Sequence, residues 1–359
     1  MLEPSATAWF GGVQANGVLE AVDLAQRPDA LSRPGWWAVV GEFEGRVRAW
    51  RFADVQVGRT TTVPQRSHRR WDGPGADAWT SSLDEETYRA GVDTIRTRIR
   101  AGDVYQVNLC RVLAAPLPAE PRGPDAAALG RRLVAGNPAP YQGGVQVGPT
   151  SDDPGVWVVS ASPELFLAVD QGRISTGPIK GTAAHSAGLS PKDRAENVMI
   201  TDLVRNDLQR VCVPGSVEVT TLLGEEQHPG LVHLVSTVTG RLDPEVARAA
   251  DAYRQVLDAT YPPGSVSGAP KSSALRLIRE LEPVPRGPYC GTVGWVHVAD
   301  DGSVRARLAV SIRTFWWSDG ILRFGTGAGI TWGSDPAAEW AETELKAARL
   351  VGLASRRTT

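Results

Sequence analysis

The sequence predicts an α+β fold, in which strands and helices interleave irregularly instead of repeating as βαβ units. Two observations support this class. Amphipathic patterns with helical spacing are separated by strand patterns at uneven intervals. The C-terminal part carries three strand patterns in succession, at 291–298, 306–316 and 321–325, as expected for antiparallel hairpins. No internal repeat of 20–50 residues is present, so a solenoid or propeller is not indicated.

The first half of the chain contains one strong helix and one distinctive strand. A helix is expected to about residue 100, because Tyr88, Val92, Ile95 and Ile99 recur at helical spacing after a capping Ser82 or Asp84. In the next strand, 104–113, alternation places Tyr105, Val107 and Leu109 on one face and Gln106 and Asn108 on the other. The other elements expected here are strands at 36–40, 47–52, 156–160, 165–169 and 173–175, a polar loop or linker at 59–80, and a Pro/Gly-rich region at 115–155 around a helix at 125–135.

The second half is expected to alternate helices and strands before the C-terminal hairpins. Ser190 and Pro191 begin a helix that runs to about residue 210, since a capping residue is followed by proline at the first helical position. The remaining expected elements are strands at 216–223 and 231–240, a helix at 244–259, a Gly/Ser/Pro loop at 262–270, a helix at 271–281, a Gly-rich loop at 325–329 and a helix at 336–353.

Composition and charge exclude several classes of protein. The chain has 359 residues, 42% of them apolar and 22% charged, which is ordinary for a folded protein and excludes a disordered or collagen-like chain. A net charge of −2 gives no field that attracts nucleic acid or an anionic membrane. No apolar run is long enough to span a membrane, and residues 1–12 lack a signal-peptide pattern. Cys110, Cys212 and Cys290 lie far apart, unlike a metal knuckle or CxxC pair. A soluble, cytoplasmic location is therefore expected.

Lysine is scarce in this sequence. Only positions 180, 192, 271 and 346 carry it, and the other 34 basic residues are arginine. Arginine serves any generic surface cation, whereas lysine can lose its proton and act as a nucleophile. The four lysines are therefore candidates for special roles, although chance retention is an equally good explanation for any single one.

Two helices each present a pair of carboxylates. Asp193 and Glu196 are three residues apart, and Glu339 and Glu342 repeat that spacing, so each pair shares a helix face. Four carboxylates on two helices can hold a hard cation such as Mg²⁺ and leave positions for substrate oxygens. Spacing alone leaves a simpler interpretation open, in which Asp193 caps its helix and Glu342 forms an i,i+4 ion pair with Lys346.

Other segments carry candidate chemistry. In GPIKGT (177–182), glycine and proline fix the backbone, so Lys180 points in a defined direction as a possible nucleophile. Glu164 in SASPE and His233 in LVHLVS are candidate acids, although a single histidine in an apolar strand is more often a core residue. SGAPK (267–271) and GTGAG (325–329) can bind an anion or simply form turns, and neither is a dinucleotide or phosphate-loop motif.

In order along the chain, these segments resemble the chorismate-utilising enzymes, the family of anthranilate, aminodeoxychorismate, isochorismate and salicylate synthases. The similar segments span about 84–350 and are AGDVYQVNL, SASPE, GPIKGT, KDRAENVMITDLVRNDLQRV, LVHLVSTVTG, PPGSVSGAPK, ELEPVPRGPYCGTVGW, SIRT and GTGAGITWGSDPAAEWAETELKA. The resemblance implies one large domain of two stacked antiparallel sheets with helices outside and the site between them. Length alone is compatible with two domains or one large one. The resemblance favours a single domain, with a short divergent N-terminal part (1–80) and a catalytic core (81–355).

The resemblance also implies roles for individual residues. Asp193, Glu196, Glu339 and Glu342 correspond to a Mg²⁺ cluster, with Glu196 and Glu342 as the direct ligands, and the ion would bind the ring carboxylate of chorismate. His233 matches the active-site histidine of the family. Ser265 stands where relatives often have threonine. The remaining implied substrate contacts are Gly181, Thr182, Tyr289, Arg313, Gly327, Gly329 and Lys346.

Two positions choose among the branches of the family. Water-using members carry a lysine base where this chain has Gln106, and a glutamine there is typical of the amine-forming members. Anthranilate synthases read PIAGT where this chain reads PIKGT, and the lysine is typical of aminodeoxychorismate synthases. In those enzymes it attacks ring C2 as the C4 hydroxyl leaves, with a glutamate at the position of Glu164 as the acid. One departure is AAHSAG after PIKGT, where relatives have a basic run.

The resemblance therefore favours the synthase component of an aminodeoxychorismate synthase, which aminates chorismate at C4 for p-aminobenzoate and folate. None of the three cysteines lies in a G-x-C-x-G turn, so ammonia is expected from a separate glutamine amidotransferase subunit. The alternatives are an anthranilate or 2-amino-2-deoxyisochorismate synthase component, or a non-catalytic chorismate-binding subunit.

Overall fold

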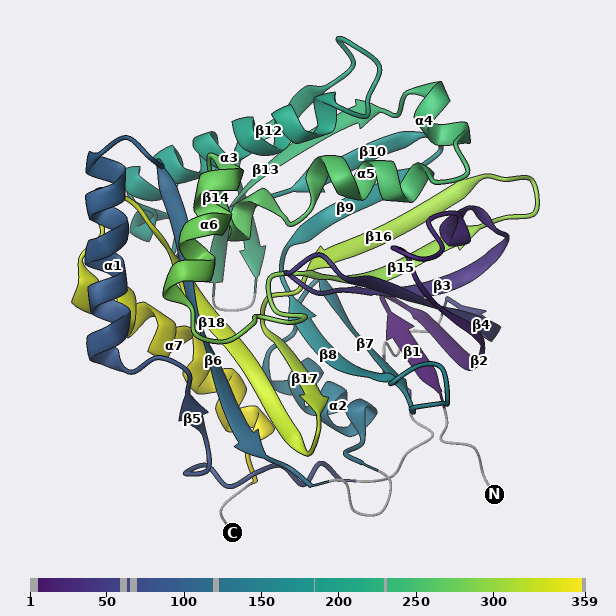
Figure 1. Cartoon of the computed structure of the whole chain (residues 1–359), viewed down its shortest axis with the longest axis horizontal. Coiled ribbons are helices and arrows are strands. Elements are labelled where there is room, and N and C mark those ends of the chain that lie inside the picture. The colour runs from purple at the N-terminus through teal and green to yellow at the C-terminus, as the bar shows by residue number, and fades with distance from the viewer. Residues whose placement is uncertain are drawn as a thin grey trace.

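The computed structural model describes residues 6–58, 63–64, 70–118, 123–183, 185–228 and 231–356. Within them, 18 strands join into a single hydrogen-bonded network, and every pairing is antiparallel. Helices pack on the outside of this network (Figure 1). The α+β expectation is thus confirmed. Most of the predicted loop at 59–69 lies outside the described residues.

The strand network has two arms, which are joined by β2 (Val13–Asp23) and β4 (Val47–Val57). The first arm is β1 (Thr7–Phe10), β7 (Tyr141–Val147), β8 (Val156–Ser162), β17 (Thr314–Ser318), β18 (Ile321–Ile330) and β6 (Gln106–Pro116), with β5 (Thr80–Ser81) and β14 (Gly268–Ala269) beside β6. The second arm is β3 (Gly35–Gly41), β15 (Thr292–Val298), β16 (Val304–Val310), β9 (Leu165–Asp170), β10 (Arg173–Gly177) and β13 (Leu231–Arg241), with β11 (Ile179–Ala183) and β12 (Glu218–His228) beside β13.

One apolar core connects the two arms. Leu109 of β6 and Val158 of β8 belong to the same buried cluster as Leu167 of β9 and Val296 of β15. Burial of this apolar surface is the main favourable term in folding. Because strands that are distant in sequence are fixed by this core, the loops at their ends are held in defined positions.

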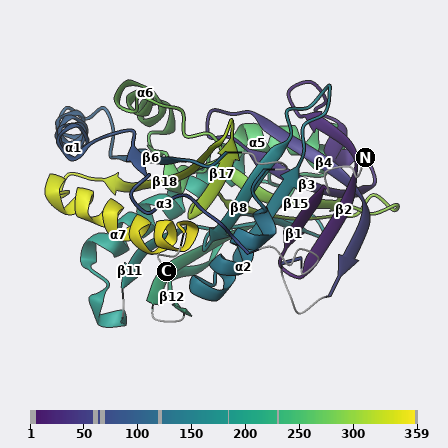
Figure 2. The ribbon, with the colours of Figure 1, turned by 90° about the horizontal axis from the view of Figure 1, so that it is seen from below.

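Each arm has helices packed against it. The helices are α1 (Glu85–Arg100), α2 (Ala126–Gly136), α3 (Pro191–Gln209), α4 (Pro244–Arg248), α5 (Ala252–Thr260), α6 (Lys271–Leu281) and α7 (Pro336–Ala354), with 3₁₀ turns η1 (Ala30–Ser32), η2 (Ser186–Gly188) and η3 (Gly264–Val266). α3 packs against β13, and α7 packs against β18 and α1. Figure 2 shows α1 and α7 at the opposite end of the molecule from β1–β4. None of the helices in the described part of the chain is both long and apolar enough to cross a membrane.

Several expected elements differ in the structure. GTGAG (325–329), predicted as a loop, is the end of β18, because its glycines allow close pairing with β6. The strand expected at 306–316 is interrupted at 311–313, between β16 and β17, and Arg313 there has a φ of +53°. The helix expected at 244–259 is two helices, α4 and α5. β1, β2 and β7 were not expected, and Tyr105 is 70% exposed before β6 begins.

Candidate active site

Three segments that are distant in sequence meet at Ser265. Lys180 lies on β11, and its Nζ donates a hydrogen bond to the carbonyl oxygen of Ser265 at 2.8 Å. Glu164 lies between β8 and β9, and its carboxyl group hydrogen-bonds with the Ser265 side chain. Ser265 itself is buried in η3. The candidate nucleophile and the candidate acid are therefore brought together around one residue.

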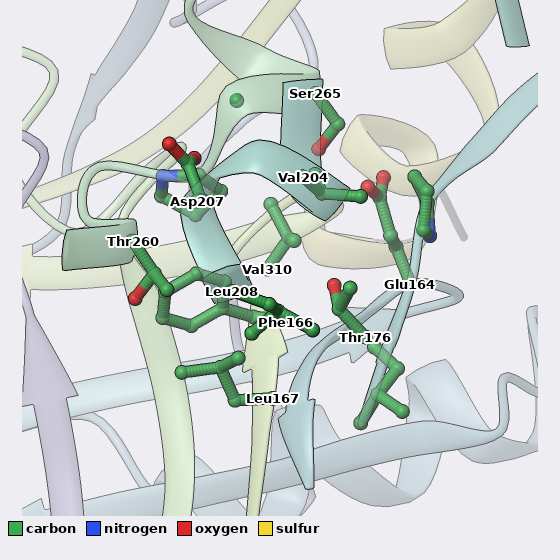
Figure 3. Close-up of a pocket in the computed structure, with 14 residues that line it drawn as sticks. Glu164, Phe166, Leu167, Thr176, Val204, Asp207, Leu208, Thr260, Ser265 and Val310 are labelled. Atoms are coloured by element: carbon green, nitrogen blue, oxygen red, sulfur yellow. The ribbon is translucent and has the colours of Figure 1, made fainter. Parts of the chain in front are cut away.

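The environment of Glu164 favours its protonated form. Its side chain is buried, and burial raises the pKa from 4.5 to about 7, against the opposing effects of Ser265, Lys180 and a backbone hydrogen bond from Ile179. Glu164 and Ser265 also line a cavity of about 10 Å³, roughly the space of one water molecule (Figure 3). Apolar side chains form most of its wall, and it is too small for a ring-sized ligand. A carboxylic acid with a pKa near 7 can donate a proton at neutral pH.

Arg313 and Tyr289 supply groups suited to a carboxylate. Arg313 lies between β16 and β17, and burial lowers the pKa of its guanidinium. Within the described residues no acidic side chain forms a salt bridge with it, so it is available to an anionic ligand. Tyr289 is buried, with its ring directly over Gly325, where a side chain would collide with it.

The glycines of β18 keep one wall of the site free of side chains. The backbone oxygen of Gly327 accepts a hydrogen bond from Lys346 Nζ at 3.0 Å, and the same ammonium group lies 2.6 Å from Glu342 Oε1. Gly329 pairs with Asn108 across β6 and β18, and any side chain at Gly329 would collide with the amide of Gln106. Gln106 is completely buried.

The predicted metal residues lie on facing ends of α3 and α7, but a lysine stands between them. Lys192 Nζ is 3.1 Å from Glu339 Oε1 and 3.7 Å from Glu196 Oε1, and both carboxylates are largely buried. The pKa of Glu196 is raised, first by burial and also by the nearby charges of Glu339 and Asp193. Acidic groups crowded in this way favour a cation among them.

The four carboxylates are chemically suited to Mg²⁺, but in this structure they are not arranged around a common point. Asp193 accepts from the backbone and hydroxyl of Ser190 in a capping box, and Glu342 pairs with Lys346. In the described residues, no three His, Cys, Asp or Glu side chains are close enough to form a ready metal site. Carboxylate oxygens are the ligands that Mg²⁺ prefers. Binding of the ion would require the Lys192 ammonium to leave Glu196 and Glu339.

The last three predicted residues lie on β11 and β13. His233 is buried on β13, directly opposite Thr182 of β11. Gly181 has a φ of +79°, and a Cβ there would lie 2.7 Å from the Cβ of Asp193. Glycine is therefore required where β11 passes the first turn of α3.

The sequence analysis assigned no site role to Lys192 or Asn108. The scarcity of lysine was the signal that could have found Lys192. Lys180, Lys192 and Lys346 hydrogen-bond within the candidate site, and Lys271 bonds to Asp207 and the carbonyl of Thr260. Asn108 follows Gln106 by two residues in a strand, and this spacing places both on one face.

Comparison with known proteins identifies the family of the chain. The model of the chorismate binding enzyme family matches residues 43–352. The chain belongs to this family. It is 39% identical over 328 residues to aminodeoxychorismate synthase component 1 of Klebsiella aerogenes, covering 88% of this chain and 68% of that protein. It is also 39% identical over 295 residues to anthranilate synthase component 1 of Streptomyces coelicolor, covering 79% of this chain and about half (54%) of that protein.

Solved structures show the same fold. The menaquinone-specific isochorismate synthase of Escherichia coli superimposes with a TM-score of 0.77 at 18% identity, covering 99% of this chain and 90% of that one. At this identity the likeness establishes the fold and leaves the reaction open. The two curated relatives carry different names at equal identity, so the choice between their reactions depends on the residues of the site.

Proposed function

We propose that this chain is the synthase component of an aminodeoxychorismate synthase, which converts chorismate and ammonia to 4-amino-4-deoxychorismate and water. The observation that carries the proposal is the cluster of Lys180, Ser265 and Glu164. An amine and a carboxyl group with a pKa of about 7 lie on either side of one residue. Nucleophilic catalysis with acid assistance needs these two groups side by side.

The cluster supports two successive displacements. Lys180 Nζ, as the free amine, forms a bond to ring C2, the two ring double bonds shift, and the C4–O bond breaks. Glu164 gives its proton to the departing hydroxyl, which leaves as water. Ammonia then bonds to C4, the double bonds shift back, and the C2–N bond breaks with its electron pair returning to Lys180. Two displacements place nitrogen at C4, whereas a single displacement by ammonia at C2 gives the product of the anthranilate branch.

The remaining polar residues are suited to binding the substrate. Arg313 and Lys346 are cations for the two carboxylates of chorismate, and Tyr289 lies beside the glycine strand. Glu196 and Glu342, with Asp193 and Glu339, are the residues that would hold Mg²⁺. When bound, the ion neutralises the ring carboxylate and fixes its position.

Ammonia is supplied by a glutamine amidotransferase partner in this proposal. Hydrolysis of glutamine by such enzymes uses a cysteine nucleophile, which has to be accessible. Cys110, Cys212 and Cys290 are all buried, and burial raises the pKa of Cys212 to about 11. A thiol in this state is a poor nucleophile.

The test is the identity of the product. The protein is incubated with chorismate, Mg²⁺ and ammonium, with and without aminodeoxychorismate lyase, and the products are separated and weighed by mass spectrometry. We expect p-aminobenzoate only when the lyase is present. Anthranilate would place the protein in the anthranilate branch, which the 39% identity to the Streptomyces relative also supports. Chorismate binding without turnover, even with the partner subunit and glutamine, would indicate a non-catalytic subunit.

A further inference from the structure

A second cavity lies between the turn that joins β3 to β4 and the helices α5 and α6. Its volume is about 380 Å³, whereas the cavity beside Glu164 measures about 10 Å³. Ligand-binding clefts in proteins typically measure about 300–1,000 Å³, and an apolar cavity of about 150 Å³ admits benzene. The second cavity is therefore large enough for an organic molecule with one or two rings.

Apolar side chains line much of this cavity. Leu24 follows β2, Phe43 and Val47 lie on either side of the β3–β4 turn, and Leu257 lies on α5; all four are buried. Leu275 of α6 is partly buried and packs against the same core. Removing apolar surface from water is favourable, so a ligand that binds here needs an apolar body.

The charged residues around the cavity leave one cation without a partner. Glu44 accepts hydrogen bonds from two consecutive backbone N–H groups, at 2.8 Å and 3.1 Å. Asp258 forms an ion pair with Arg254, one turn earlier on α5. Arg279, in the last turn of α6, is exposed and has no hydrogen bond or ion pair within the part of the chain that the structure describes.

This distribution of charge favours an anion. Both acidic side chains already have partners, so an ammonium group on the ligand would find no unpaired carboxylate. The guanidinium of Arg279 has five N–H donors in a geometry suited to the oxygens of a carboxylate or sulfonate. Arg279 follows Leu275 by four residues, so the cation and the apolar wall share one face of α6.

We propose that this cavity binds an amphipathic organic anion, with its apolar body against Leu257 and Leu275 and its anionic group on Arg279. The cavity is separate from the candidate active site. Tyr261 lines it, and the Tyr261 ring packs edge-on against Phe166, which lines the Glu164 cavity, with the ring centroids 5.9 Å apart. Binding of the anion uses none of the residues proposed for catalysis and does not depend on the proposed function.

The test uses two fluorescent probes of similar shape and different charge. Anilinonaphthalene sulfonate is an organic anion, and phenylnaphthylamine is its uncharged counterpart. Both become brighter in apolar surroundings, so titration against the full chain gives a Kd for each. We expect Arg279→Met to raise the Kd of the sulfonate at least fivefold and to leave that of the uncharged probe within twofold. Arg276→Met is the matched control, because Arg276 is exposed on the same helix and does not line the cavity. It should change neither Kd.

A second variant tests the volume. Leu275→Trp places a larger side chain in the cavity and should weaken binding of both probes at least tenfold. Saturating chorismate should leave the Kd of the sulfonate within twofold. Displacement of the probe by chorismate would place the probe in the candidate active site and overturn the proposal. A Kd for the sulfonate that is the same in Arg279→Met, Arg276→Met and the unmodified protein would overturn it too. If Leu275→Trp does not fold, the comparison of the two arginine variants decides alone.

Discussion

Replacing Glu164 by glutamine should make the protein more stable at alkaline pH while removing its acid. Glutamine has the shape of the protonated carboxylic acid and cannot ionise. In the native protein the pKa of Glu164 is about 7 instead of 4.5, and each pKa unit corresponds to about 1.4 kcal/mol. Ionised Glu164 therefore costs the native state about 3 kcal/mol at pH 8. The contribution of the protonated group is fully present below pH 4.5 and is lost as the pH rises through 7.

The assay is urea unfolding followed by tryptophan fluorescence. At pH 8 the unfolding free energy of Glu164→Gln should exceed that of the unmodified protein by about 3 kcal/mol. At pH 5 the excess should be under about 1 kcal/mol. Glu280→Gln is the control, because Glu280 is exposed, and it should show no such dependence. A difference that is the same at both pH values would refute the argument. The rate of amination by the unmodified protein should fall above pH 7, where the acid loses its proton.

Three further substitutions test other contacts. Lys180→Ala should retain chorismate binding, but its amination rate should fall by orders of magnitude. Intact-mass spectra should no longer show a covalent adduct with the mass of chorismate less one water. Unchanged turnover to a 4-amino product would exclude the nucleophile role. Gly181→Ala should lower the unfolding free energy by about 1–3 kcal/mol, because its φ is +79° and the new Cβ meets α3; an unchanged midpoint in urea would contradict this. Lys271→Met should cost about 3 kcal/mol by leaving buried Asp207 unpaired, whereas Arg356→Met, from an exposed ion pair, should cost little; equal losses would argue against the effect of burial.

Local patterns predicted the helices better than the glycine-rich strand. α1 and α6 follow from apolar residues at helical spacing with clear starts, and the structure confirms both. GTGAG reads as a loop locally because glycine favours turns. It is a strand because β6 lies beside it and Cys110 fills the space over Gly327. That pairing is a tertiary contact between residues more than 200 positions apart, which no local pattern contains.

The sequence indicated which residues to examine as candidates, but it indicated their hydrogen-bond and ion-pair partners less well. Lys180 and Glu164 were expected as nucleophile and acid, and the structure places both at Ser265. Spacing indicated the two acidic pairs, which lie on α3 and α7. It did not indicate the lysine between them, because ion pairs across two helices depend on how the helices pack. The unpartnered Oδ1 of Asn108 and the position of Gly329 opposite it are visible only in the structure.

The confinement of lysine to four bonded positions makes the protein an unusual substrate for amine-selective chemistry. Every lysine ammonium bonds to an oxygen from another part of the chain, and three of the four do so in the candidate site. On most proteins, acylating reagents modify scattered surface lysines, and the extent of modification says little about any one site. Here the extent of acylation at each lysine, compared with and without chorismate, would measure the occupancy of the candidate site. Conversely, lysine-directed cross-linking or immobilisation would act mainly on the candidate site, which contains three of the four lysines.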